Sequence, residues 1–244
     1  MNYKILISIC IGLMILIGTA SAYTVTRITT NAADQTNPSI YNKYIVWQDT
    51  RNGGSDIYLR NLGTQVQTRV TKGVDAEHPY VSGNRIVWQD KRNGNWDIYM
   101  YNISTKKTSR ITTNTADQTD PSIYGNLIVW ADTRNGGSSI YLQNLATKVQ
   151  TRLTTNGTSP SIFGNRIIWN SETNEGEGFV IMLYDLATKK ASPIYFDIDP
   201  YSVSISGNRI IYNDMFNGMF TGMYDIGTKK HINLPFPYVS DPKF

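Results

Sequence analysis

The sequence predicts an all-β fold, a β-propeller of four-stranded blades, most simply with five blades. Three features support this fold class. A motif at residues 47–58 recurs at residues 88–99 and 130–141. The aromatic residue that opens the motif recurs in five units at intervals of 41, 42, 39 and 43 residues, and a period near forty is typical of propeller blades. The chain also contains 16 Tyr and 5 Trp, which favour strands.

Each unit is expected to contribute four strands joined by short turns. In the first unit the strands are predicted at residues 38–41, 44–47, 56–62 and 65–70. The turn between the first two strands is Gly83-Asn84 in the second unit, and Gly and Asn tolerate the positive φ of tight hairpins. No stretch shows helical periodicity over two turns. The five units are placed at residues 38–71, 79–112, 121–154, 160–195 and 203–234.

Residues 1–22 have the pattern of a secretory signal. Lys4 precedes an apolar run at residues 5–18, and Ala20-Ser21-Ala22 resembles a cleavage site. An uncleaved anchor is the alternative, although the apolar run is short for a membrane span. The single Cys10 lies in this segment, so residues 23–244 would form one propeller domain without disulfides. The sequence therefore predicts a secreted or cell-envelope-associated protein.

Two short segments fall outside the five units. Residues 24–30 resemble a last strand without the three strands that should precede it, and residues 237–240 repeat the sequence of residues 79–82. One interpretation is a five-bladed ring in which the N-terminal strand overlays the last blade. The other is an incomplete six-bladed ring, left open at a partial blade. Closure is favoured because open sheet edges promote aggregation.

The repeated loop motif favours a structural role over a catalytic one. The Trp at the end of the second strand, Trp47 in the first unit, is expected to pack between blades. In the Asp49-x-Arg51 sequence that follows, the carboxylate can accept loop N–H groups while it pairs with the guanidinium. Because the pattern occurs in three units, we interpret it as a clamp, with catalysis as the alternative.

The Ile-Val-Trp, Asp-x-Arg-x-Gly and Asp-Ile-Tyr elements of these units resemble the TolB-type, WD40-like propeller repeat, and are similar to repeat surface proteins of methanogenic archaea. The resemblance covers residues 24–234 and implies the architecture rather than an activity, since such propellers serve many functions. The family's Ser-Pro-Asp-Gly turn is replaced by Gly-Asn-Arg, and the extra N-terminal domain of TolB is absent, which argues against a TolB-like role in translocation. Without a peptidase domain, oligopeptidase activity is not expected.

The strand order predicts that charges separate onto two faces. Loops after the second and fourth strands of each unit share one face, the top, and hairpin turns after the first and third strands share the other, the bottom. The top is expected to collect 16 of the 19 acids. A basic bottom could rest on an anionic wall or membrane surface, and the alternative is turn chemistry that keeps the protein soluble. The bottom bases are Lys43, Arg85, Lys106, Lys107, Lys148, Arg166, Lys189, Lys190, Arg209, Lys229 and Lys230.

Candidate ligand-binding residues are expected on the top face. An acid four residues before the opening proline of the first three units should lie around the mouth of the central channel, where oxygen ligands could hold Ca²⁺ or a polyol. No EF-hand-like spacing is present, and no cofactor is predicted. The alternative is a structural role, in which these acids pair with the arginines of the loop motif. Trp96 could stack on a sugar or peptide, or pack on its own hairpin. The candidate set is Trp96, Asp34, Asp75, Asp117, Arg51, Arg92 and Arg134.

The fourth and fifth units lose the loop motif. Residues 170–178 are acidic and longer, and residues 215–220 are rich in Met and Phe. Departures of this kind mark functional sites or capping units. An exposed apolar loop is a candidate contact for a partner, and its residues are Met215, Phe216, Met219 and Phe220.

The sequence predicts a binding or protein-interaction module for a glycan, a peptide or an envelope partner, and not an enzyme. His78 and His231 are the only histidines, and no Ser-His-Asp arrangement has a geometric basis. The alternatives are a hydrolase or lyase that acts on carbohydrate through top-face carboxylates, and a purely structural surface-layer component. Nucleic acid is disfavoured because no basic-aromatic groove is present. Asn102 and Asn156 begin glycosylation acceptor sequences.

Overall fold

The computed structural model describes residues 25–173, 178–194, 200–214 and 220–237. The predicted signal at residues 1–22 lies outside this part, as do residues 174–177 of the acidic loop and Met215, Phe216 and Met219. Within it every regular element is a strand, so the all-β prediction is confirmed. No helix in the described ranges could cross a membrane.

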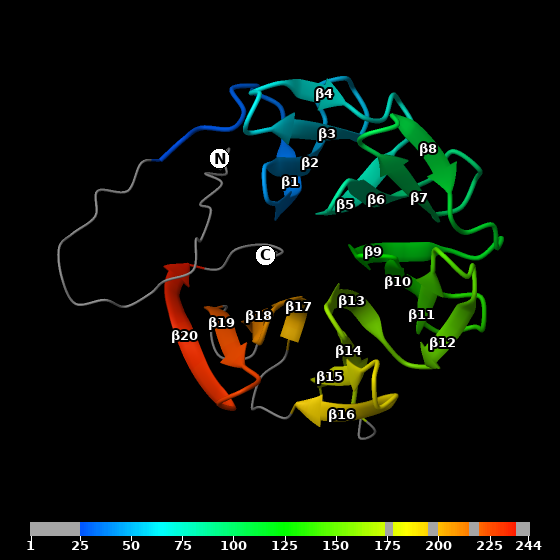
Figure 1. Cartoon of the computed structure of the whole chain (residues 1–244), viewed down its shortest axis with the longest axis vertical. Coiled ribbons are helices and arrows are strands. Elements are labelled where there is room, and N and C mark those ends of the chain that lie inside the picture. The colour runs from blue at the N-terminus through cyan, green and yellow to red at the C-terminus, as the bar shows by residue number, and fades with distance from the viewer. Residues whose placement is uncertain (1–24, 174–177, 195–199, 215–219, 238–244) are drawn as a thin grey trace.

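The strands form five antiparallel sheets of four, in which strands consecutive in sequence pair side by side (Figure 1). The predicted five-bladed propeller is therefore confirmed. Blade by blade, the strands are β1 (Gln35–Tyr41), β2 (Tyr44–Asp49), β3 (Asp56–Asn61) and β4 (Gln67–Arg69); β5 (Ala76–Ser82), β6 (Arg85–Asp90), β7 (Asp97–Asn102) and β8 (Lys107–Arg110); β9 (Gln118–Tyr124), β10 (Leu127–Asp132), β11 (Ser139–Asn144) and β12 (Gln150–Thr154); β13 (Thr158–Phe163), β14 (Arg166–Glu172), β15 (Phe179–Asp185) and β16 (Lys190–Ile194); β17 (Pro200–Ser206), β18 (Arg209–Asp214), β19 (Phe220–Asp225) and β20 (Lys230–Pro237).

The first strand of each blade lies innermost and the fourth lies at the outer rim (Figure 1). Contacts between inner strands run from β1 to β5, β9, β13 and β17 in turn. A serine of one inner strand holds the next: Ser39 Oγ accepts the Val81 N–H at 3.2 Å, and Ser122 does the same for Ile162. The inner strands therefore surround a central channel and fix the spacing of the blades.

The core lies between blades rather than within them. Val46, Ile57 and Leu59 of the first blade pack on one side of the second blade, against Ile86 and Trp88. Burying such apolar faces against each other is the main stabilising contribution in a propeller of this kind. The prediction that the repeated aromatic residue is a core residue is confirmed, because its side chain is at most 1% exposed in every blade: Trp47, Trp88, Trp130, Trp169 and Tyr212.

The expected closure of the ring by residues 24–30 is wrong. The fifth blade has its own outer strand, β20, and Ile28 packs instead against Trp47 and Tyr58 of the first blade. Ile28 takes on the first blade the place that Val70, which follows β4, takes on the second. Residues 25–30 therefore behave as the end of a preceding outer strand, docked on the blade that follows it. Pro237, expected to begin another unit, is the last residue of β20.

Candidate functional site

The loop motif after β2 forms a buried clamp. The Asp49 carboxylate is fully buried and accepts hydrogen bonds from Trp47 Nε1 at 2.9 Å and from the Arg51 amide and Nε at 3.0 and 2.8 Å. The Tyr58 ring lies between the Trp47 ring, at a centroid separation of 5.9 Å, and the Arg51 guanidinium, 4.4 Å away. Asn52 Nδ2 then donates to the Tyr58 hydroxyl at 2.7 Å.

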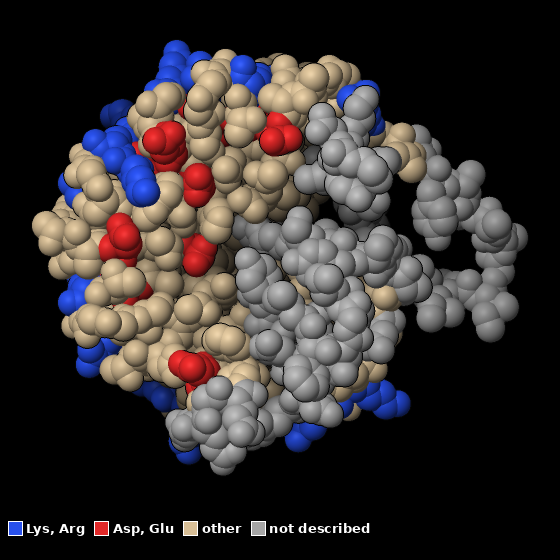
Figure 2. Space-filling model, turned by 180° about the vertical axis from the view of Figure 1, so that it is seen from behind, with Lys and Arg blue, Asp and Glu red and all other residues tan. Residues whose placement is uncertain are grey.

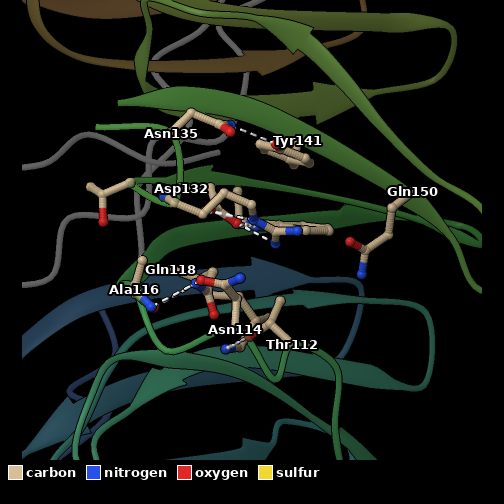
Figure 3. A network of polar contacts seen from close by, with 12 residues as sticks. Thr112, Asn114, Ala116, Gln118, Asp132, Asn135, Tyr141 and Gln150 are labelled. Carbon is tan, nitrogen blue, oxygen red and sulfur yellow. Dashed lines mark hydrogen bonds and ion pairs between the residues drawn. The ribbon is translucent and has the colours of Figure 1, made fainter. Parts of the chain in front are cut away.

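The same clamp is present in the second and third blades. Asp132 and Arg134 repeat the arrangement, and Asn135 donates to the Tyr141 hydroxyl at 2.8 Å (Figure 3). Burial alone would raise the pKa of Asp49, but hydrogen bonds from Arg51 and Trp47 outweigh it, and the pKa is lowered. The Asp, the Arg and the Asn that follows it in this loop thus have partners inside their own blade. This supports the structural interpretation of the motif over catalysis.

A second buried acid ties β3 to β4. Asp56 accepts from Arg69 Nε at 2.9 Å, from the Thr71 hydroxyl at 3.2 Å and from the Gly73 amide at 2.9 Å. In the second blade Arg110 Nη2 lies 2.7 Å from Asp97. The acids expected on the top face therefore include several that solvent does not reach, and each is paired with an arginine: Asp49, Asp56, Asp90, Asp97 and Asp132.

The remaining acids give the top face its surface charge. Figure 2 shows acidic side chains over the described part of this face, with Lys and Arg mostly along its outline. The arginines of the loop motif do not offset this charge, because each is already bound to a buried acid of its own loop. The solvent-accessible acids among the described top-face residues are Asp34, Asp75, Glu77, Asp117, Asp120 and Glu172.

A bulge at the start of each inner strand turns one side chain out of the regular pattern. The pairing register shifts between Thr36 and Ser39 in β1, and the same shift occurs in β5, β9 and β13. The residue before the proline has a positive φ of 50° or 51° in all four strands, a conformation that is uncommon outside glycine. Bulges of this kind re-aim side chains beside functional sites. We call these residues the mouth ring, and they are Asn37, His78, Asp120 and Ser159.

The mouth ring brings together groups from different blades. His78 Nδ1 lies 2.5 Å from Asp120 Oδ1, and the two side chains are 37% and 31% exposed. Asn37 Nδ2 donates to Gln48 Oε1 at 2.9 Å, and the Asp120 amide donates to Gln89 Oε1 at 2.9 Å. The ring is therefore a polar site with fixed backbone and accessible side chains at the top of the channel.

The acids predicted to surround the channel lie three residues before the mouth ring. Asp34, Asp75 and Asp117 are exposed, and Asp117 Oδ1 accepts the Trp96 N–H at 2.9 Å. The alternative pairing of these acids with the loop arginines does not occur within the described residues, since Arg51, Arg92 and Arg134 each bind the Asp of their own loop. They belong to the connections that precede the inner strands and are not part of the mouth ring.

Trp96 packs against its own hairpin. The ring is half-buried, with Lys91 Nζ 4.6 Å from its centroid, and its carbonyl accepts the Gln118 N–H at 2.8 Å. Gln118 is itself tied to the same connection, because its Nε2 donates to the Ala116 carbonyl at 2.6 Å (Figure 3). Trp96 therefore lies where the second blade meets the third, with one ring face under Lys91.

The sequence reasoning missed the contact between His78 and Asp120. These residues immediately precede Pro79 and Pro121, so they occupy the same position in neighbouring units. That shared position is the signal that could have found them, because equivalent positions on adjacent inner strands face the same channel. Among the described residues, no group of three or more His, Cys, Asp or Glu is placed to hold a metal ion.

Known proteins share the fold of this chain, and the likeness shows no specific function. No protein-family model matches the chain, and no curated protein matches it. Among solved structures, TolB from Acinetobacter baumannii aligns with a TM-score of 0.67 at 20% identity over 88% of this chain, which spans 58% of that protein. A putative TolB from Agrobacterium tumefaciens gives 0.69 at 15% identity, over 84% of this chain and 82% of that one.

A structure of a nidogen/laminin complex also aligns, with a TM-score of 0.62 at 12% identity over 82% of this chain and 79% of that one. At these identities the likeness concerns the fold alone. This chain is similar in architecture to TolB-type β-propellers.

Proposed function

We propose that this protein is a secreted or cell-surface propeller that binds an extended segment of a partner protein at the mouth ring. The observation that carries this proposal is the mouth ring itself, in which four consecutive blades have a polar residue at the same bulged position and His78 contacts Asp120 of the next blade. The backbone at these positions is strained in the same way four times, and strain of this kind clusters where ligands bind.

The chemistry of the mouth ring suits a peptide. It offers an amide, an imidazole, a carboxylate and a hydroxyl, which together can donate to and accept from a main chain. The acids around it favour a segment that carries Lys or Arg, and they speed its approach at low ionic strength. Secretion through residues 1–22 and kinship with archaeal surface repeats are parts of the proposal that rest on the sequence.

A peptide array tests this function. Purified residues 23–244 are applied to an array of random peptides, and the best binders are then measured in solution with wild type, Asp120→Asn and His78→Asn. The expected result is a set of basic peptides whose affinity falls about tenfold in either variant, as expected for the loss of one charge-assisted hydrogen bond.

The matched control is Glu172→Gln, which removes an exposed acid of the top face outside the mouth ring. The control should leave affinity within about twofold, because exposed charges contribute little. Equal loss in all three variants, or no selection of peptides at all, would rule out the mouth ring as the binding site.

An enzyme is the second candidate, because an imidazole held by a carboxylate is the arrangement of a general base. No hydroxyl nucleophile is hydrogen-bonded to His78 within the described residues, so the chemistry left to it is activation of water. Release of reducing ends from a polysaccharide panel, or cleavage of bound peptides, lost in His78→Asn, would establish this candidate over the binding module.

A further inference from the structure

The first hairpin turn of the first blade departs from the turn of every other blade. Blades two to five all have Gly-Asn between their first two strands, and three of them continue with Arg, as in Gly83-Asn84-Arg85. The first blade has Asn42-Lys43-Tyr44 instead. Asn42 adopts a φ of 51°, where the glycines of the other turns adopt 56° to 59°. A side chain is thus held in a conformation that the other blades give to glycine.

The arginine of the common turn links neighbouring blades. Arg85 Nη1 donates to the Gly125 carbonyl at 2.7 Å and to Asn126 Oδ1 at 2.8 Å, and so ties the second blade to the third. Arg166 does the same from the fourth blade to the fifth, through Gly207 and Asn208. Each arginine fills the space between two neighbouring turns on the bottom face.

In the first blade that space is a pocket. Tyr44 occupies the arginine position, and a pocket of about 280 Å³ lies between its turn and the turn of the second blade. Lys43 Nζ lies 5.6 Å from the centroid of the Tyr44 ring. The residues that line the pocket are Tyr41, Asn42, Lys43, Tyr44, Gly83 and Asn84.

We propose that this pocket binds an acidic sugar, a saccharide with a carboxylate or a phosphate group. Lys43 supplies the charge for the anion, and the Tyr rings offer flat surfaces for the C–H face of a sugar ring. The Gly83 carbonyl oxygen and Asn84 Oδ1 are equivalent to the oxygens of Gly125 and Asn126 that accept hydrogen bonds from Arg85. In the first pocket they can therefore accept hydrogen bonds from the hydroxyls of a sugar. A cation, aromatic rings and hydrogen-bond acceptors therefore meet at this pocket.

The surrounding charge excludes the opposite kind of ligand. A guanidinium from a partner would fit the two acceptors, but it would lie beside Lys43, on the face whose hairpin turns carry Lys and Arg residues. The positive charge of Lys43 would repel a guanidinium in the pocket, whereas it attracts an anion. The site lies on the bottom face, opposite the mouth ring, and does not depend on the proposed function.

The test is binding measured by titration calorimetry with trigalacturonic acid, mannose 6-phosphate and neutral maltotriose. At least one acidic sugar should bind, and maltotriose should bind at least about tenfold more weakly, the loss of one charge-assisted contact. Tyr44→Arg installs the arginine of the other blades and should abolish binding while the protein stays folded. Lys43→Asn should weaken binding about tenfold for the same reason. The two acidic probes show whether carboxylate or phosphate is preferred.

Two control variants separate a built site from general attraction to a basic face. Leu127→Arg makes the same charge change at the equivalent position of the third blade, and Lys107→Asn removes a base elsewhere on the bottom face. Both should keep affinity within about twofold, as expected for a distant exposed charge. The proposal is overturned if no probe binds, if maltotriose binds as well as the acidic sugars, if Tyr44→Arg binds like wild type, or if the controls lose as much affinity as Lys43→Asn.

Discussion

Asp49 illustrates how single residues stabilise this fold. A carboxylate with no exposed surface is held by the indole of Trp47 and the guanidinium of Arg51, and the Arg51 guanidinium lies on the Tyr58 ring. Without those partners, burial of the charge would be strongly unfavourable. The fourth blade lacks this arrangement, because Ser171 stands where the other blades have Asp, and Trp169 Nε1 is buried without a hydrogen-bond partner among the described residues.

This difference predicts unequal effects of one substitution in two blades. Trp47→Phe should lower the free energy of unfolding by about 1–3 kcal/mol more than Trp169→Phe, because it removes a donor from the buried Asp49. Both changes remove the same indole volume, so each is the control for the other. The measurement is urea unfolding followed by circular dichroism. Equal losses would mean that the indole hydrogen bond to Asp49 adds nothing.

A second residue-level prediction concerns acid. The pKa of Asp49 is lower in the folded chain than its ordinary value of 3.8, so the folded state binds fewer protons than the unfolded state in this range. The resulting stability is fully present above pH 3.8 and is lost as pH falls through the folded pKa. Asp49→Asn, compared with wild type by thermal unfolding between pH 7 and pH 2, should show a smaller loss in acid. Parallel curves would contradict the assignment.

At the scale of the strand, the blades are distinguished by the bulge in the inner strand and by the packing of the third strand. The bulge in β1, β5, β9 and β13 gives the residue before the proline a positive φ, while apolar positions after the proline stay in the interface between blades. Close packing of the third strand sets another limit. In β19, Gly222 lies against the ring of Tyr212, where the first three blades place a Tyr on a Trp.

Gly222 is therefore expected to tolerate no side chain. A Cβ at this position would overlap the Tyr212 ring, so Gly222→Ala should destabilise the protein by about 1–3 kcal/mol, as overpacking does. Gly137→Ala is the matched control, since a Cβ there meets nothing within 4 Å. Urea midpoints report both. A Gly222→Ala protein as stable as Gly137→Ala would show that the fifth blade can rearrange around Tyr212.

At the scale of the whole molecule, the described residues of the first and fifth blades share no apolar cluster, unlike those of the other neighbouring blades. The apolar cluster on the first side of the first blade contains residues of that blade and Ile28, whereas each other cluster joins two blades. Ile28 is 5% exposed, although no strand is assigned to residues 25–34. The segment before β1 is therefore part of the domain and not a linker.

Removal of this contact tests its importance. Ile28→Ala should cost about 2–4 kcal/mol, the range for a buried Ile, because it exposes the side of the first blade that carries Trp47 and Tyr58. Val25→Ala is the control, because Val25 is 76% exposed. The measurement is the melting temperature of each variant in thermal unfolding. Equal melting temperatures would place the segment outside the cooperative unit.

The repeat made the fold predictable, whereas the bulge in the inner strands made the site hard to predict. The period and the aromatic frame were sufficient for five blades, and the clamp followed from Asp49 and Arg51 occurring in three units. Sequence placed the channel acids at Asp34 and its equivalents, three residues from the mouth ring, because the bulge is marked only by the repeated position before the proline and by no residue type. It also counted Asp56 as surface charge, since only the structure shows that Arg69 and Thr71 enclose it.

The mouth ring lies outside the apolar contacts that stabilise the scaffold. Its four side chains come from the bulged position, and none of them belongs to the apolar clusters that hold the blades together. Their replacement should therefore change what is bound without unfolding the domain, within the set of residues that accept a positive φ, chiefly Asn, Asp, His and Gly. The domain can thus act as a four-position library, in which new ligands are selected by varying Asn37, His78, Asp120 and Ser159 on an unchanged frame.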